Sequence, residues 1–306
     1  MSESYTSDVF LNAPDILFLH LSEIFKSFLF HGTVTLEILS CAFMPLFKGG
    51  LKSANKSDSY RTLAGASRLL KLFEYVVLDL WGHLLATDSM QFGFKSGVST
   101  TQCTWLVLEV ATYFMRRGVS VNSCLLDCSK AFDKCRFDKL FTTMLSKSVP
   151  AVVVRALVFA YQEQKGWIRT GERNSDTFQI SNGTRQGSVL SPLLFTACYL
   201  DGLIVKLRKM ELGCFVEGWW MGCLGYCDDL ILLAPNREVL QKMVSVCEEY
   251  GEEMNLEFST DPVPAKSKTK CILFSGTHKR VSYPKAVKLK GKELPWVEKG
   301  NTWDTF

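Results

Sequence analysis

The chain is 306 residues long, 47% hydrophobic and 22% charged, so it can fold around one large or two modest cores and is not expected to be disordered. Its net charge of +4 is unevenly spread, because residues 265–300 hold ten Lys or Arg against two Glu and leave the rest of the chain at −4. The eleven Cys lack zinc-ligand or CxxC spacing, and the sequence shows neither a signal peptide nor an apolar run long enough to span a bilayer. We therefore expect a reduced protein of the cell interior, in the nucleus or cytoplasm, that does not bind membranes.

Apolar residues at three- and four-residue spacing predict helices over residues 16–31, 66–86 and 100–116. The polar segment 44–61, which carries Gly and Lys, predicts a loop. The other predicted elements are a buried strand at 121–129, helices at 131–145 and 150–164, a hairpin of 167–173 with 177–182, a long helix at 187–210, hairpin segments at 215–220 and 223–234, a helix at 237–250 and a strand at 271–274. From residue 122 onward this order favours an α+β fold, with an antiparallel sheet covered by helices on one face, over a doubly wound parallel sheet.

Two adjacent carboxylates, Asp228 and Asp229, lie between apolar runs at the expected tip of a hairpin. Ordinary two-residue hairpin turns favour Asn-Gly or Asp-Gly, and neighbouring like charges repel one another unless a cation lies between them. Mg²⁺, which takes oxygen ligands at about 2.0–2.1 Å, suits such a pair. The alternative is a solvated acidic turn.

A third carboxylate, Asp127, directly follows the residues VNSCLL (121–126) of the predicted strand. If that strand neighbours the acidic hairpin, three carboxylates could hold two Mg²⁺ ions about 3.5–4 Å apart, the arrangement used for in-line phosphoryl displacement. Asp is common at strand ends and helix caps, so Asp127 by itself would indicate little. The combination of the three predicts a site for phosphoryl chemistry.

The segment 182–195 combines flexible backbone with fork-like donors. Gly183 and Gly187 allow the backbone to approach a ligand closely, while Arg185 and Gln186 can donate to phosphate, sugar or base. Without the acidic motifs, a loop followed by a helix cap would be the better interpretation.

Three segments, in this order and spacing, closely resemble motifs A, B and C of reverse transcriptases: LLDCSKAFD (125–133), NGTRQGSVLSPLLF (182–195) and GYCDDLILLA (225–234). The flanking segments SYRTL, LLKLFE, QFGFKSGVSTTQ and KSKTKCILFSG are similar to the LINE-type, non-LTR retrotransposon branch of that family. The resemblance implies an RNA-directed DNA polymerase that uses an RNA template, a DNA primer and dNTPs, with Mg²⁺ as cofactor and Mn²⁺ as a possible substitute.

Carried over position by position, the resemblance assigns the metal ligands and the chemistry. It implies that Asp127, Asp228 and Asp229 bind the metal ions, and that Phe132 is the steric gate that packs where a ribose 2′-hydroxyl would lie. Lys268 takes the place of the lysine proposed to protonate the leaving pyrophosphate.

The resemblance also implies a set of nucleotide-binding residues. Arg61 in SYRTL matches the arginine that pairs with the triphosphate. Arg185, Gln186 and Gly187 match residues that touch the incoming nucleotide and the template–primer duplex.

The implied architecture is that of a right-hand polymerase with an absent or truncated thumb. We expect N-terminal helices and fingers over residues 1–120, a palm over 121–285 with a fingers insertion at about 145–182, and the start of a truncated palm–thumb connection over 286–306. A group II intron maturase, which shares the palm, would carry a basic helical domain after it. A truncated, catalytically silent retrotransposon remnant that at most binds nucleic acid is the alternative from another class.

The basic stretch near the C-terminus predicts a nucleic-acid contact. Ten cations over 36 residues repel one another on a free surface, and a phosphate backbone would neutralise them with release of counterions. We expect the primer–template duplex to run along this stretch, with four leading candidates: Lys279, Arg280, Lys285 and Lys288. A solvated, Lys-rich tail is the alternative.

Overall fold

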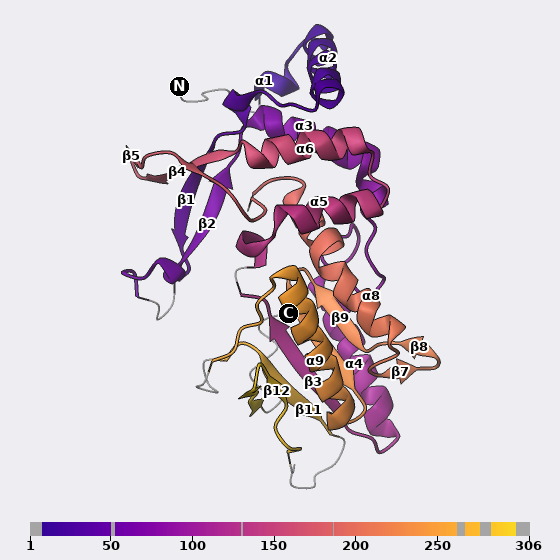
Figure 1. Ribbon diagram of the computed structural model, residues 1–306. Coiled ribbons are helices and arrows are strands. Elements are labelled where there is room, and N and C mark those ends of the chain that lie inside the picture. The colour runs from indigo at the N-terminus through magenta and orange to yellow at the C-terminus, as the bar shows by residue number, and fades with distance from the viewer. Residues whose placement is uncertain are drawn as a thin grey trace. The chain divides into compact units, whose positions relative to one another are not determined.

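The computed structural model describes residues 8–49, 53–129, 131–185, 187–261, 267–275 and 283–297, which fall into two compact units (Figure 1). The first unit comprises residues 1–85 and 137–191, and the second comprises 86–136 and 192–306. The chain therefore enters each unit twice, so each hydrophobic core joins segments that are distant in sequence. Within the described residues no helix is long and apolar enough to cross a bilayer.

The first unit contains helices α1, α2, α3, α5 and α6 and strands β1, β2, β4, β5 and β6. The helices are Asp8–Leu11, Asp15–His31, Arg68–Trp81, Phe137–Ser146 and Ala151–Gln162, with 3-10 turns at Leu36–Ile38, Ser57–Ser59 and Gly82–Leu85. The strands are Cys41–Phe47, Tyr60–Gly65, Lys165–Thr170, Arg173–Asn174 and Phe178–Gln179. The rings of Phe25, Phe28 and Phe73 pack α2 on α3, with centroids 5.4 to 6.0 Å apart.

The predicted loop at 44–61 is wrong at both ends, because β1 runs through Phe47 and β2 starts at Tyr60. The two strands pair antiparallel over six residues, and β4 pairs with β1 only from Cys41 to Phe43. Pro45 has no amide hydrogen to donate, and it lies in the part of β1 that has β2 as its single neighbour among the described strands. The two strands form a largely exposed ribbon. Their residues therefore lack the alternation of apolar and polar side chains by which a half-buried strand is recognised in a sequence.

The second unit is built on a five-stranded sheet in the order β14-β11-β3-β10-β9. Strands β3, β9 and β11 of this sheet are labelled in Figure 1. Its strands are β3 at Val121–Asp127, β9 at Cys223–Tyr226, β10 at Asp229–Ala234, β11 at Lys270–Phe274 and β14 at Trp296–Val297, with small hairpins of β7 (Phe215–Val216) with β8 (Trp219–Trp220) and β12 (Lys288–Leu289) with β13 (Lys292–Glu293). All pairs in the large sheet are antiparallel except β11 with β14.

Helices cover both faces of this sheet, so the predicted cover on one face is wrong. One face packs on α8 (Asp201–Lys209) and α9 (Arg237–Met254), and the other packs on α4 (Thr100–Arg116). Alternate residues of β3 and β10 enter the two cores, since Leu126 belongs to the first and Leu125 to the second. A strand that is apolar on both sides is typical of a sheet buried on both faces.

Local sequence sets the helix ends. The side-chain Oδ1 of Asn236 accepts the amide hydrogen of Val239 at 2.9 Å to start α9, which ends where Asn255 takes a left-handed φ of 56°. The helix predicted at 131–145 is divided into a 3-10 turn (Ala131–Lys134) and α5, because the amide of Arg136 donates to the hydroxyl of Tyr199 at 2.8 Å.

The long helix predicted at 187–210 begins later than expected. Its first turn, α7, is Ser191–Leu194, with Pro192 inside that turn as predicted. A π-helical segment, Phe195–Leu200, then leads directly into α8. Residues 187–190 lie outside the helix, since Gly187 has a φ of 109°.

Candidate active site

Three acidic residues meet at one end of the sheet of the second unit. β3 ends at Asp127, β10 begins at Asp229, and the two residues are direct partners in the antiparallel ladder. Asp228 lies in the two-residue loop between Tyr226 and Asp229 that closes the β9–β10 hairpin. Ladder partners point to the same face of a sheet, so the strand register brings Asp127 and Asp229 together, as the sequence predicted.

The electrostatics of this acidic cluster favour bound positive charge. Burial, together with the nearby charges of Asp228 and Asp127, raises the pKa of the Asp229 carboxyl to about 7, and the Lys268 ammonium opposes that shift. The Nζ atom of Lys268 lies 3.1 Å from an Oδ atom of Asp127. Because the Lys268 side chain is 69% exposed, this ion pair can exchange with other cations.

We expect Asp229→Asn to raise thermal stability at neutral and alkaline pH in buffer containing EDTA. The carboxyl has an ordinary pKa of 3.8 and a folded-state pKa of about 7, so the folded state holds its proton more tightly than the unfolded state does. The wild type therefore loses stability as pH rises from about 4 through about 7, and the Asn variant does not lose this contribution. Unfolding midpoints of the two proteins from pH 4 to pH 8 test this, and a difference that is independent of pH would contradict it.

The acidic cluster suits a hard divalent cation in the chemistry of its donors. Carboxylate oxygens are the ligands that Mg²⁺ prefers, and Asp127 already binds one cation, the Lys268 ammonium. Over the part of the chain that the structure describes, no three acidic, His or Cys side chains converge as a ready-made metal cluster. The residues thus fit such an ion in the chemistry of their donors, and the strand register places Asp127 beside Asp229.

Phe132 lies five residues after Asp127, in the 3-10 turn Ala131–Lys134. Its ring is half-buried, and its centroid lies 4.6 Å from that of Phe195 in the π-helical segment. Phe195 is fully buried, so it provides a fixed surface under the Phe132 ring. This packing restrains the ring, and the role in sugar selection that the resemblance implies for it stays a prediction.

Thr269 is a residue of this site that the sequence did not indicate. Its hydroxyl oxygen accepts the amide hydrogen of Asp127 at 3.2 Å, and its side chain is fully buried. The carbonyl of Asp127 accepts from the amide of Ser259 at 2.8 Å. These bonds hold the backbone at the end of β3. The partners lie far apart in sequence and follow no periodic pattern, so only the fold shows them.

Arg185, predicted to contact nucleotide or template–primer, is buried inside the first unit. One of its terminal nitrogens lies 3.6 Å from the Glu74 carboxylate, and the guanidinium is 5.6 Å from the Tyr161 ring centroid. Glu74 also accepts hydrogen bonds from the hydroxyl of Ser188 at 2.6 Å and from the amide of Val189 at 2.8 Å. In this structure Arg185 therefore organises the 185–189 loop from inside, and its predicted nucleotide contact stays a prediction.

We expect Glu74→Gln to lower the free energy of unfolding by about 3–5 kcal/mol, because it leaves the Arg185 guanidinium buried without its counter-charge. Glu74 and Arg185 are 1% and 3% exposed, so water cannot replace the lost partner. Urea unfolding measures the effect. Adding Arg185→Met to the first change should recover part of the loss, and strictly additive losses would show that the pair is not coupled.

Arg61 and Gly187 also belong to the first unit. Arg61 is exposed on β2, opposite Leu46 of β1. A Cβ atom at Gly187 would lie 2.8 Å from the carbonyl oxygen of Ala64, so the glycine permits close contact between this loop and β2. Gln186 lies outside the described residues. The predicted nucleotide contacts of all three stay predictions.

Two of the four basic candidates are described. The side chains of Lys285 and Lys288 are exposed in the second unit, and the backbone of Lys288 is bonded to the side chain of Gln241 on α9 through its amide at 2.8 Å and its carbonyl at 2.9 Å. Lys279 and Arg280 lie outside the described residues. At both positions the charged heads are exposed, and at Lys288 the backbone is held on α9.

Solved structures similar to this chain share its mixed α+β fold. Apo telomerase from Candida tropicalis, truncated from its C-terminal domain, aligns with a TM-score of 0.54 at 13% identity over 82% of this chain and 52% of that one. Candida tropicalis telomerase in complex with a TWJ fragment of telomeric RNA aligns with the same score at 12% identity over 83% of this chain and 44% of that one. At such identities the likeness establishes the fold.

Sequence comparison then establishes the family. A family model described as reverse transcriptase (RNA-dependent DNA polymerase) matches residues 52–283, so the chain belongs to the reverse transcriptase family. The Pol polyprotein of the type-1 retrotransposable element R2 of Nasonia vitripennis is 25% identical over 263 residues, which cover 85% of this chain and 25% of that protein. The RNA-directed DNA polymerase from the mobile element jockey of Drosophila funebris is 28% identical over 261 residues, covering 80% of this chain and 27% of that protein.

These relatives confirm the predicted resemblance to the reverse transcriptase domain of non-LTR retrotransposons. The chain spans about a quarter of the length of the R2 and jockey relatives. Reverse transcriptases in general use divalent metal ions, which accords with the acidic cluster.

Proposed function

We infer that the chain is the core of an RNA-directed DNA polymerase, which adds dNTPs to the 3′ end of a DNA primer along an RNA template. Family membership supports the reaction class. The observation that carries the proposal is the pairing of Asp127 with Asp229 beside Asp228, where burial, together with the nearby charges of Asp228 and Asp127, raises the pKa of Asp229 to about 7. Such a cluster binds cations, and a polymerase needs bound cations beside the nucleotide phosphates.

In this proposal the second unit is the palm and the first unit supplies the fingers. The five-stranded sheet with its acidic hairpin supports the first assignment. The exposed β1–β2 ribbon, which bears Arg61, supports the second. The fingers insertion predicted at about 145–182 falls within the segment 137–191 of the first unit.

Asp127, Asp228 and Asp229 would hold Mg²⁺, or Mn²⁺ in its place. When bound, the ions supply Lewis-acid activation of the primer 3′-hydroxyl and neutralise charge on the leaving pyrophosphate. Lys268, close to Asp127, can bring a proton or a positive charge to the same region. The Phe132 ring restricts the space beside the nucleotide sugar, and Arg61 binds the triphosphate.

Primer extension on poly(rA)/oligo(dT) by the purified chain, with dTTP and with or without Mg²⁺, tests the proposal. We expect extension that depends on the ion and ceases when EDTA is added. Binding of template–primer without any extension, in Mg²⁺ or Mn²⁺, would instead identify a silent nucleic-acid-binding remnant and overturn the catalytic proposal.

We expect replacement of Lys279, Arg280, Lys285 and Lys288 by Gln to weaken template–primer binding evenly across sequences. Phosphate contacts carry no base information, so affinity should fall without a change in sequence preference. If all four contact phosphates, the slope of log affinity against log salt should flatten by about 3–4. An unchanged slope would place the basic stretch away from the nucleic acid. Glu238→Gln on α9 provides a control for a surface charge outside the stretch.

A further inference from the structure

Residues 88–95, which include the first five residues of the segment QFGFKSGVSTTQ (91–102), lie along the edge of the second unit's sheet. The amide of Phe92 donates to the carbonyl of Gly225 at 2.7 Å, and the amide of Gly225 donates to the carbonyl of Met90 at 2.8 Å. Gln91 thereby forms a parallel bridge with Gly225 of β9. This short segment, which we call the edge segment, borders the strand that leads into the acidic hairpin.

The Gln91 side chain is fully buried and contacts the hairpin turn itself. Its Oε1 accepts the amide hydrogens of Gly93 at 2.8 Å and Cys227 at 3.1 Å, while its Nε2 donates to the carbonyl of Cys227 at 3.2 Å. The opposite orientation of the amide would place a donor against two donors, so the hydrogen-bond pattern determines its orientation. One side chain thus holds both backbone polar groups of the residue that precedes Asp228.

Cys227 needs such a restraint. Its φ is 57°, a left-handed conformation that non-glycine residues keep only where their surroundings enforce it. The turn is also closely packed, since a Cβ atom at Gly93 would lie 2.3 Å from the amide nitrogen of Cys227. A Cβ atom at Gly225 would lie 2.9 Å from Nε2 of Gln91. The two glycines leave the space in which the Gln91 amide meets the turn.

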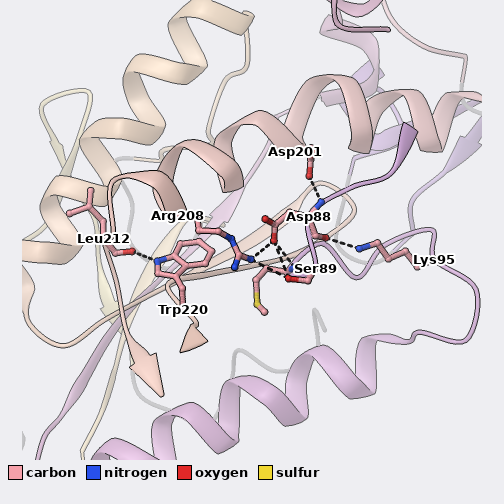
Figure 2. Close-up of polar contacts among 8 residues, drawn as sticks. Asp88, Ser89, Lys95, Asp201, Arg208, Leu212 and Trp220 are labelled. Carbon is pink, nitrogen blue, oxygen red and sulfur yellow. Dashed lines mark hydrogen bonds and ion pairs between the residues drawn. The ribbon is translucent and has the colours of Figure 1, made fainter. Parts of the chain in front are cut away.

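The edge segment is in turn fixed to α8 by a polar network (Figure 2). The amide of Asp88 donates to the Asp201 carboxylate at 2.6 Å, and the Asp88 carboxylate forms an ion pair with Arg208. Lys95 donates to the carbonyl of Asp88 at 2.6 Å, and the Arg208 guanidinium lies 4.8 Å from the Trp220 ring centroid. Gln91 is therefore carried by a segment that is fixed to α8 through Asp88, three residues before it.

We propose that Gln91 is a positioning residue, which acts through Cys227 to fix the hairpin turn so that Asp228 and Asp229 are held in the arrangement that binds divalent ions. This inference rests on the proposed function, because it names a residue that prepares the same site. Gln91 touches neither substrate nor metal in this role. It sets the backbone of the turn, and the turn sets the carboxylates.

Two variants and one control test the proposal in the full chain. Gln91→Met keeps the length of the side chain and removes all three hydrogen bonds. Gly93→Ala keeps the Gln91 amide and displaces Cys227, whose amide nitrogen would lie too close to the new methyl group. Gln164→Met is the matched control, because Gln164 is fully buried in the first unit and its side-chain amide has no hydrogen-bond partner among the described residues.

Four quantities are measured for each protein: hydrogen exchange of the Cys227 amide, Mn²⁺ affinity, the primer-extension rate and template–primer affinity. For both test variants we expect faster exchange, Mn²⁺ affinity and extension rate reduced by about 10–100-fold, as for other residues that orient metal ligands, and unchanged template–primer affinity. The control should match the wild type in all of them.

The outcomes separate this inference from the proposed function. If the Cys227 amide exchanges no faster in Gln91→Met than in the wild type, the positioning role of Gln91 is overturned. It is also overturned if the amide exchanges faster but Mn²⁺ affinity and extension rate stay at the wild-type level. If the wild type binds Mn²⁺ but extends no primer, the polymerase proposal fails, while exchange and Mn²⁺ affinity still decide the role of Gln91. A wild type that binds no Mn²⁺ would overturn both.

Discussion

Asp228→Asn should abolish most primer extension, with a rate at least about a thousandfold below that of the wild type. The replacement keeps the size of the side chain and removes one negative ligand from the acidic cluster. Metal ions contribute several kcal/mol of charge stabilisation in the transition state, and about 4 kcal/mol corresponds to about a thousandfold in rate. Single-turnover extension of an annealed primer at saturating dTTP measures this effect on the chemical step.

The same experiment separates loss of chemistry from loss of fold or of substrate binding. Asp228 lies in a turn and is half-buried, so the variant should unfold close to the wild-type temperature and bind template–primer normally. Asp79→Asn, an exposed change on α3, is the matched control and should leave the rate unaltered. An Asp228→Asn protein with more than a tenth of the wild-type rate would contradict a role in metal binding.

The acidic cluster could be predicted because its elements carry strong local signals. Apolar runs on both sides of Asp228 and Asp229 mark two strands joined by a tight turn, and the strand that ends at Asp127 carries the apolar run 124–126 directly before it. When β3 and β10 pair side by side in antiparallel fashion, their register places Asp127 opposite Asp229.

What could not be predicted depends on partners that no local pattern marks. Gln91 and Cys227 are 136 residues apart, and a glutamine in an aromatic- and glycine-containing segment gives no sign that its amide will hold a strained turn. Arg185 has the side-chain chemistry of an exposed ligand-binding residue, but Glu74 of the distant helix α3 neutralises it in the interior. Tertiary contacts decided the role of each side chain.

The segments around Pro45 and Arg136 show a second limit. Proline and lysine in the segment 44–61 favour a loop. An exposed strand ribbon nevertheless accommodates both, because Pro45 lies where no backbone amide donor is needed. Residues 131–145 do form helical structure, but the hydroxyl of Tyr199 accepts the amide hydrogen of Arg136, and the helix is divided at that point. In both cases a single backbone hydrogen-bond position overrides the average preference of the segment.

Phe132→Val should relax the choice between deoxyribonucleotides and ribonucleotides. In the proposed function the Phe132 ring fills the space that a ribose 2′-hydroxyl would need, and its contact with the buried Phe195 ring keeps it from moving aside. Shortening the side chain should lower the ratio of dNTP to rNTP kcat/KM by about 10–200-fold, the range expected when a pocket gains or loses a small group. Most of that change should be a gain in rNTP use.

A loosened core could lower both activities without changing selectivity, so the control must loosen the same unit. Phe274→Leu truncates a fully buried ring on β11, within the core that α4 covers, and should reduce stability while leaving the dNTP-to-rNTP ratio unaltered. Incorporation of dTTP and of UTP on poly(rA)/oligo(dT) gives the ratio for all three proteins. If Phe132→Val lowers both efficiencies in equal proportion, as core loosening would, then Phe132 serves packing and does not select the sugar.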